Sequence, residues 1–189
     1  MSDPPVLRQA GSLHAIPFLM LKSPLSILSL SLTMLYFSAC GQGTSNTDEQ
    51  SSELRFDTTK TAVLEFKRSL VAWVFDSTYK PAKLIQNDLS VIDSFLIKAV
   101  NDFNSWQEKN NPNHPWKIDL KNRGYRKQII TVTNKKGEKE VWVNCFCSTT
   151  HTDWKSNLVI VEDGAGCFFN FKINLTTKTY YDFRVNPAA

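Results

Sequence analysis

Cysteine is the residue type with the most chemistry to offer in this chain, and its four cysteines occur in two settings. Cys40 stands alone at the end of an apolar run, whereas Cys145, Cys147 and Cys167 lie in the C-terminal half. Cys145, Cys147 and His151 could bind zinc, with Cys167 as a further ligand, because thiolates and imidazole are ligands that zinc prefers. The C-x-C spacing lacks the longer knuckle of structural zinc sites, so it argues against a metal.

The same cluster allows two other interpretations. Cys147 could act as a nucleophile with His151 and Asp153, since a thiol needs a base to form the reactive thiolate. The three thiols could instead be free and buried, packing as small apolar residues, and the geometry favours this. Cys145 and Cys147 would lie about 6.6 Å apart on one strand face, at the upper limit for a disulfide. A predicted intervening strand separates Cys147 from Cys167. We therefore expect no disulfide, metal or cofactor.

Residues 20–40 have the layout of an export signal. Lys22 supplies the positive charge, Leu25 to Phe37 form an apolar run, and two small residues precede Cys40. The apolar run is shorter than the roughly 20 residues that cross a bilayer, so a signal peptide is favoured over a membrane span. Three prolines lie before Met20, which is unusual for a leader. Met20 is therefore predicted to be the true start.

The tetrad Phe37-Ser38-Ala39-Cys40 resembles the lipobox of bacterial lipoproteins, with phenylalanine where the pattern prefers leucine. The resemblance implies that residues 1–39 are removed and that Cys40 carries diacylglycerol, often with a further acyl chain such as palmitate. Two or three chains anchor a protein stably, because each buried CH₂ contributes about 0.8 kcal/mol. Residues 40–53 then form a polar tether. The alternative is an ordinary secretory leader with Cys40 as an unmodified thiol.

The last third of the chain also resembles a group of uncharacterised small lipoproteins of Bacteroidetes-type bacteria. The similarity lies in VWVNCFC (residues 141–147), Trp154, VIVEDGAGCFFNFKINL (residues 159–175) and the ending YYDFRVNPAA. It implies a lipoprotein of the cell envelope, in the outer membrane, facing the periplasm or the cell surface. It implies no catalytic residue.

The amino-acid composition limits the domain organisation and the classes of partner that the chain could have. Apolar residues make up 42% of the chain, which is enough for a core in a single domain over residues 54–189. The net charge is +4, and acidic residues are interspersed with basic ones, as in KKGEKE at residues 135–140. A nucleic-acid-binding stripe would carry one sign of charge, so no nucleic-acid partner is expected.

Periodicity predicts an α+β domain. Apolar residues recur at spacings of three and four between Asp88 and Gln107, which predicts a long amphipathic helix capped by Asn87 or Asp88. Residues 61–75 fit one or two strands, or a strand and a short helix. Five further strands with alternating residues are predicted at 128–134, 140–147, 157–162, 167–175 and 179–185. A helix packed on such an antiparallel meander is the arrangement of cystatin-like rolls.

Alternation along the predicted strands separates two faces. Phe169, Phe171 and Tyr181 are among the residues assigned to the helix-packed face. The opposite face mixes aromatic rings with polar groups, which could hold a sugar or a peptide. Its members are Trp142, Asn144, Phe146, Phe168, Asn170, Lys172, Tyr180 and Arg184. The alternative is that the N-terminal segment or a second subunit covers these aromatic residues.

These observations predict a lipid-anchored envelope protein that binds or scaffolds a protein, peptide or glycan through this face. One alternative is a hydrolase or thiol enzyme with catalytic residues that the sequence does not identify. Another is an inhibitory or structural partner protein that uses the open sheet edge. The chain contains no Gly-rich phosphate loop, no G-x-S-x-G and no H-E-x-x-H, so an enzyme is not the favoured class.

Overall fold

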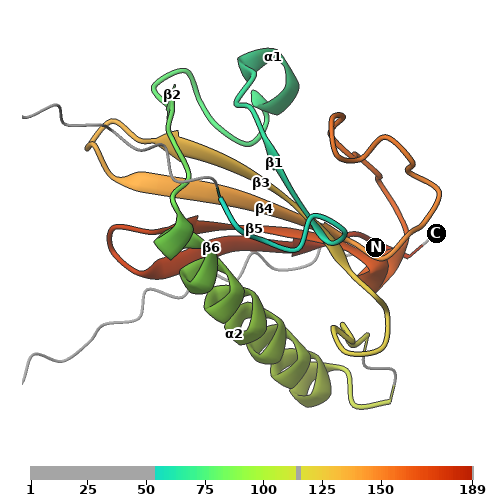
Figure 1. Ribbon diagram of the computed structural model, residues 1–189. Coiled ribbons are helices and arrows are strands. Elements are labelled where there is room, and N and C mark those ends of the chain that lie inside the picture. Colours follow the sequence, from blue (N-terminus) through green and yellow to red (C-terminus); the bar gives the residue numbers. More distant parts are fainter. Residues whose placement is uncertain (1–53, 114–115, 189) are drawn as a thin grey trace, which may run out of the picture. The chain divides into compact units, whose positions relative to one another are not determined.

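The computed structural model describes residues 54–113 and 116–188 as an α+β fold with a mostly antiparallel sheet (Figure 1). The predicted signal peptide, Cys40 and the tether lie outside these residues. The sheet has the order β1-β3-β4-β5-β6, and β2 pairs with β3. The strands are β1 (Thr61–Leu64), β2 (Lys80–Pro81), β3 (Arg126–Thr133), β4 (Lys139–Phe146), β5 (Phe168–Asn174) and β6 (Thr179–Val185). The helices are α1 (Arg68–Val71), α2 (Gln86–Asn110) and a 3₁₀ turn, Ala165–Cys167.

Helix α2 covers one face of the sheet and closes the main core. Its buried face includes Leu89, Ile92, Ala99, Val100 and Phe103. These residues pack against the inward side chains of β3, β4, β5 and β6 in one apolar cluster. The helix begins at Gln86, two residues earlier than predicted. The Asp88 carboxylate accepts a hydrogen bond from the Ile85 N–H (2.9 Å) and pairs with Lys139 Nζ (2.9 Å), so it fixes the helix start to the sheet.

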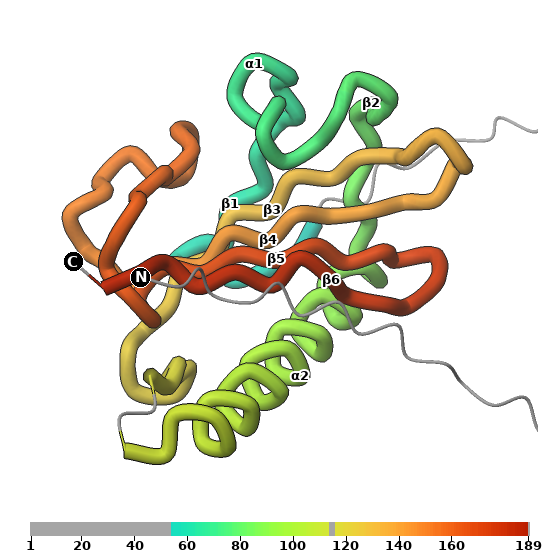
Figure 2. Tube along the Cα trace, turned by 180° about the vertical axis from the view of Figure 1, so that it is seen from behind, coloured from blue at the N-terminus to red at the C-terminus, as the bar shows by residue number. Residues whose placement is uncertain are grey.

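The second face of the sheet is also covered. Figure 2 shows α1 and the 147–167 segment on the side of the sheet opposite α2. Val71, Val74 and Phe75 from the α1 region bury Trp142 of β4 in a second apolar cluster. Trp154 and Val159 cover Phe146 in a third. The sheet is therefore the middle layer of three. We call the side of the sheet opposite α2 its outer face, and this face is covered by the α1 region and the 147–167 segment.

The predicted strand at residues 157–162 is wrong. Val159 packs against the sheet and Val161 is partly buried, which gives the alternation of a strand. The backbone of this segment, however, bonds to side-chain amides. Gln128 Nε2 donates to the carbonyls of Trp154 (2.6 Å) and Asn157 (2.7 Å), and the Val159 N–H donates to Gln128 Oε1 (3.0 Å). Asn144 Nδ2 donates to the Val159 carbonyl (2.8 Å).

The loss of that strand corrects the cysteine prediction. Without an intervening strand, β4 pairs directly with β5 in an antiparallel register that places Phe146 opposite Phe168. Cys147 then lies beside Cys167, the Cα atoms are 5.0 Å apart, and the two residues form a disulfide. The expectation of three free thiols was wrong for this pair. Cys145 is the free, buried cysteine of the described residues.

A β-bulge in β6 corrects the assignment of two tyrosines. Asp182 has a φ of 52°, and the pairing with β5 shifts there, so that Asp182 and Phe183 together oppose Phe171. The shift reverses the facing of the residues before it. Tyr180 therefore packs on the α2 side and Tyr181 lies on the outer face, the reverse of the prediction.

Removal of the disulfide should destabilise the domain measurably. The bridge closes a loop with a sequence separation of 20 residues, for which the chain-entropy estimate is about 3 kcal/mol. We expect the Cys147→Ala/Cys167→Ala variant to lose about that much free energy of unfolding in urea titrations. Dithiothreitol should destabilise the wild type and leave the double variant unchanged. Equal sensitivity of both proteins to the reductant would contradict the pairing.

Candidate functional site

The aromatic and polar face predicted from the strands is not an open binding surface. Trp142 is 2% exposed, and Asn144 and Phe146 are buried beneath the covering segments. Phe168 is partly buried beside His151, with ring centroids 6.2 Å apart. Tyr180 lies on the other face and donates to Asp102 of α2 (2.5 Å). The alternative in which the N-terminal part of the domain covers these rings is the arrangement found at Trp142.

The part of this face that reaches solvent is a small hollow beside α1. Asn170, Lys172 and Arg184 line it with Trp73, which is 54% exposed and stands edge-on to Trp142 at 5.4 Å. Asn170 Oδ1 accepts from Trp142 Nε1 (3.2 Å), and Lys172 pairs with Asp182 (3.1 Å). Most polar groups of the hollow are therefore already bonded within the protein.

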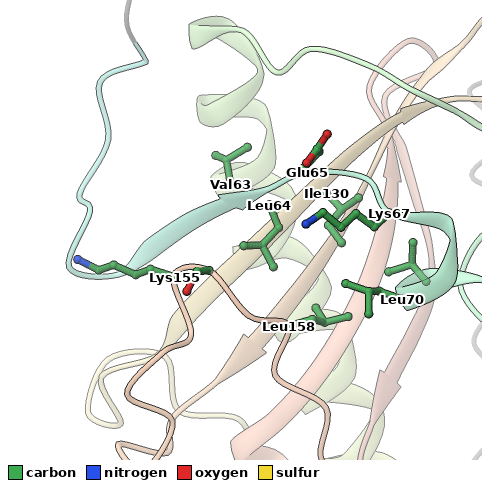
Figure 3. Close-up of a pocket in the computed structure, with 10 residues that line it drawn as sticks. Val63, Leu64, Glu65, Lys67, Leu70, Ile130, Lys155 and Leu158 are labelled. Atoms are coloured by element: carbon green, nitrogen blue, oxygen red, sulfur yellow. The ribbon is translucent and has the colours of Figure 1, made fainter.

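A larger groove lies on the other side of α1 and is the candidate functional site (Figure 3). Its volume is about 190 Å³. Leu64 of β1 and Ile130 of β3 form the floor, Leu70 of α1 forms one wall, and Leu158 of the 147–167 segment forms the other. Leu70 is 48% exposed although it is apolar. The groove therefore offers an apolar surface of the kind that binds an apolar group of a partner.

The charged side chains at the groove are mainly basic. Lys67 precedes α1 and Lys155 lies on the opposite wall, where Figure 3 shows its side chain extending outward. Glu65 is the acidic residue that also lines the groove. All three side chains belong to exposed residues, and none forms an ion pair within residues 54–113 and 116–188. The apolar floor and basic rim together favour a partner that carries both an apolar group and negative charge.

Sequence analysis did not identify the groove residues as functional. The apolar stretch at 61–75 was recognised, but its period did not reveal which residues stay exposed. Leu70 lies in α1 and Trp73 lies in the turn that follows, three residues later, where Trp73 Nε1 donates to the Leu70 carbonyl (3.1 Å). The buried apolar residues of this segment are Val71, Val74 and Phe75, which lie at other positions than Leu70 and Trp73. The three-residue spacing of Leu70 and Trp73 was the signal in the sequence from which their shared exposure could have been predicted.

The cysteine cluster offers no catalytic or metal site. Cys147 is consumed by the disulfide, so neither the Cys147, His151 and Asp153 nucleophile nor the zinc set with Cys145 can form in this structure. No cluster of histidine, cysteine, aspartate and glutamate suited to a metal occurs in the described part of the chain. Burial raises the pKa of the Cys145 thiol to about 12, which keeps it protonated and unreactive at neutral pH.

A buried carboxylate organises the opposite end of the outer face. Glu140 Oε1 accepts hydrogen bonds from Asn134 (2.7 Å) and Asn174 (3.3 Å), and Oε2 accepts from the hydroxyls of Tyr79 (3.3 Å) and Tyr181. Burial, followed by the hydrogen bond to Glu140, raises the pKa of Tyr181 well above its ordinary value. The four donors come from four different segments, and the two asparagines also donate to Glu138, so the cluster links these segments to β4 and leaves no open polar site.

No protein-family model, curated protein or solved structure matches this chain. None of the helices in the described residues is long and apolar enough to cross a membrane. The groove and the residues that line it are therefore the features from which a function can be inferred.

Loss of the buried carboxylate should destabilise the domain. Glu140→Ala leaves the hydroxyls of Tyr79 and Tyr181 without their acceptor and removes one of the two acceptors of the asparagine amides, which costs about 2–3 kcal/mol. We expect Glu138→Ala, a matched control, to destabilise the domain less than Glu140→Ala, because that glutamate shares both asparagine partners but is only partly buried. Urea unfolding measures the loss in each variant, and equal losses in the two alanine variants would disprove the assignment.

Proposed function

We propose that this chain is a lipid-anchored protein of the bacterial cell envelope whose domain binds a partner through the groove beside α1. The supporting observation is a groove of about 190 Å³ that has an apolar floor and basic residues at its edge. A single exposed leucine is ordinary on a protein surface, but Leu70 is grouped with Leu64, Ile130 and Leu158 in one hollow, and grouped apolar side chains of this kind can form a binding site. The basic side chains at the rim of the groove favour a partner that carries negative charge.

The N-terminal sequence is the basis for proposing a lipid anchor. The tetrad that ends at Cys40 has the pattern of a lipobox, and residues 41–53 are polar enough to act as a tether for the domain. The location is then the outer membrane, facing the periplasm or the cell surface. The packing of α2 on an antiparallel sheet is consistent with a cystatin-like roll, a comparison that concerns the arrangement of elements and brings no activity with it.

The groove is a better binding site than the aromatic face on which the function was first predicted. That face retains only the hollow lined by Trp73, Lys172 and Arg184, whose neighbouring polar groups are largely bonded internally. The groove combines the larger volume with unpaired charged side chains. The thiol-enzyme alternative loses support because its nucleophile, Cys147, is oxidised.

Lipidation predicts a specific thiol count in the mature chain. The disulfide accounts for Cys147 and Cys167, a lipid would block Cys40, and burial protects Cys145, whose pKa is about 12. We expect no thiol to react with a disulfide reagent at pH 8 in the native protein, and one to react in denaturant. Mass spectrometry should find diacylglycerol on Cys40 as the first residue. One reactive thiol in the native protein, or an N-terminus upstream of Cys40, would disprove the anchoring proposal.

Groove binding can be tested with anilinonaphthalene sulfonate, an anionic apolar probe. We expect Leu70→Asp to weaken probe binding about tenfold or more, because it places negative charge in the apolar wall. Ile97→Asp is the matched control, since Ile97 is similarly exposed (55%) but lies on α2, on the other side of the sheet. Fluorescence titrations use the full lipidated chain in nanodiscs, with empty nanodiscs subtracted. Unchanged binding by Leu70→Asp would contradict the proposed site.

A further inference from the structure

Strand β1 bounds the groove and ends the sheet, and its outer edge is unpaired within residues 54–113 and 116–188. The Lys127 N–H donates to the Lys60 carbonyl (2.8 Å), and Thr61 is the register partner of Lys127. In a parallel pair, alternate residues direct both peptide groups to the neighbouring strand. Residues 60, 62 and 64 therefore face β3, and Val63 directs its N–H and C=O away from the sheet.

The two edges of the sheet differ in how well they could accept another strand. The free edge of β6 carries the bulge at Asp182, whose carboxylate is paired with Lys172. Bulges and charges of this kind block the addition of a further strand. Strand β1 pairs with β3 in a continuous register and contains neither proline nor a charged residue from Thr61 to Leu64. Its edge is therefore the more receptive of the two.

From this edge and the groove beside it we propose that the partner is a short, extended, acidic peptide segment that adds to β1 as a further strand. The N–H and C=O of Val63, which have no partner among the described residues, match the donors and acceptors of an extended backbone, which a peptide supplies and a lipid or glycan does not. β1 is four residues long, so the paired segment spans about 13 Å. This inference rests on the groove being the binding site.

The groove defines which side chains the segment carries. Successive residues of an added strand alternate between the two faces of the sheet, so every second side chain lies on the outer face beside Leu64. An apolar side chain at that position fits the hollow between Leu70 and Leu158. Glutamate or aspartate nearby would pair with Lys67 and Lys155, neither of which has an ion-pair partner in the described residues.

Selection from a random peptide display library on the full chain in nanodiscs tests the partner class. We expect the enriched peptides to combine leucine, isoleucine or valine with flanking Asp or Glu, and a Lys67→Glu/Lys155→Glu variant to enrich Lys and Arg instead. Lack of enrichment, or the same enriched sequences with both proteins, would overturn the proposal. If the sulfonate probe still requires Leu70 in that case, the proposed function stands and only the peptide inference fails.

Strand addition has a separate signature in backbone amide exchange. The enriched peptide should slow exchange of the Val63 amide at least tenfold and leave the amides of β6 unchanged. Val63→Pro removes the outward N–H without removing a bond to β3, so it should abolish peptide binding, whereas Val63→Ala should retain it. Unchanged exchange at Val63 on peptide addition would overturn strand pairing. So would full protection of this amide in the free chain, because another segment would then already occupy the edge.

Discussion

Two buried side-chain amides, on Gln128 and Asn144, hold the 147–167 segment against the sheet, and the outer half of the fold depends on them. They bond to each other (3.1 Å) and to the backbone of Trp154, Asn157 and Val159, which lacks a neighbouring strand. Buried peptide groups without partners are costly, so these bonds allow an irregular segment to lie on an apolar face. The amides thereby supply the hydrogen bonds that a neighbouring strand would otherwise make to this backbone. Phe146 is covered as a result, and β4 is left free to pair with β5.

The direct pairing of β4 with β5 brings the two halves of the disulfide together and closes the covering segment at its base. Cys147 and Cys167 mark the beginning and end of this segment, so the bridge restricts it in the unfolded chain, while Gln128 and Asn144 fix its middle in the folded one. Asn186 adds a third amide contact, to the Asp163 carbonyl (3.0 Å) near the end of the segment. A disulfide of this kind persists in an oxidising compartment, which agrees with the export that we propose.

The groove lies over the sheet at the place where the two covering segments approach each other. The α1 region is held by Val71 and Phe75 against Trp142, and the 147–167 segment is held by its amide bonds. Between them Leu64 and Ile130 of the sheet remain as an apolar floor. The adjacent edge of β1 is left without a partner strand in the described part of the chain, so apolar surface and open backbone groups lie together. Together, the apolar surface and the open backbone groups support peptide binding more strongly than either feature would alone.

Local sequence determined the features that depend on neighbouring residues. The period of residues 89–106 lies within α2, and alternation correctly assigned Phe169 and Phe171 to the helix side. The lipobox resemblance is likewise a local pattern and remains a prediction. Tertiary structure decided what covers the other face. A strand carrying Trp142 and Phe146 has the same alternation whether its outer side meets solvent or a protein segment, because side-chain direction is set by the backbone and burial by distant residues. The bulge at Asp182 and the Cys147–Cys167 pair were also beyond the sequence, since both depend on which strands are neighbours.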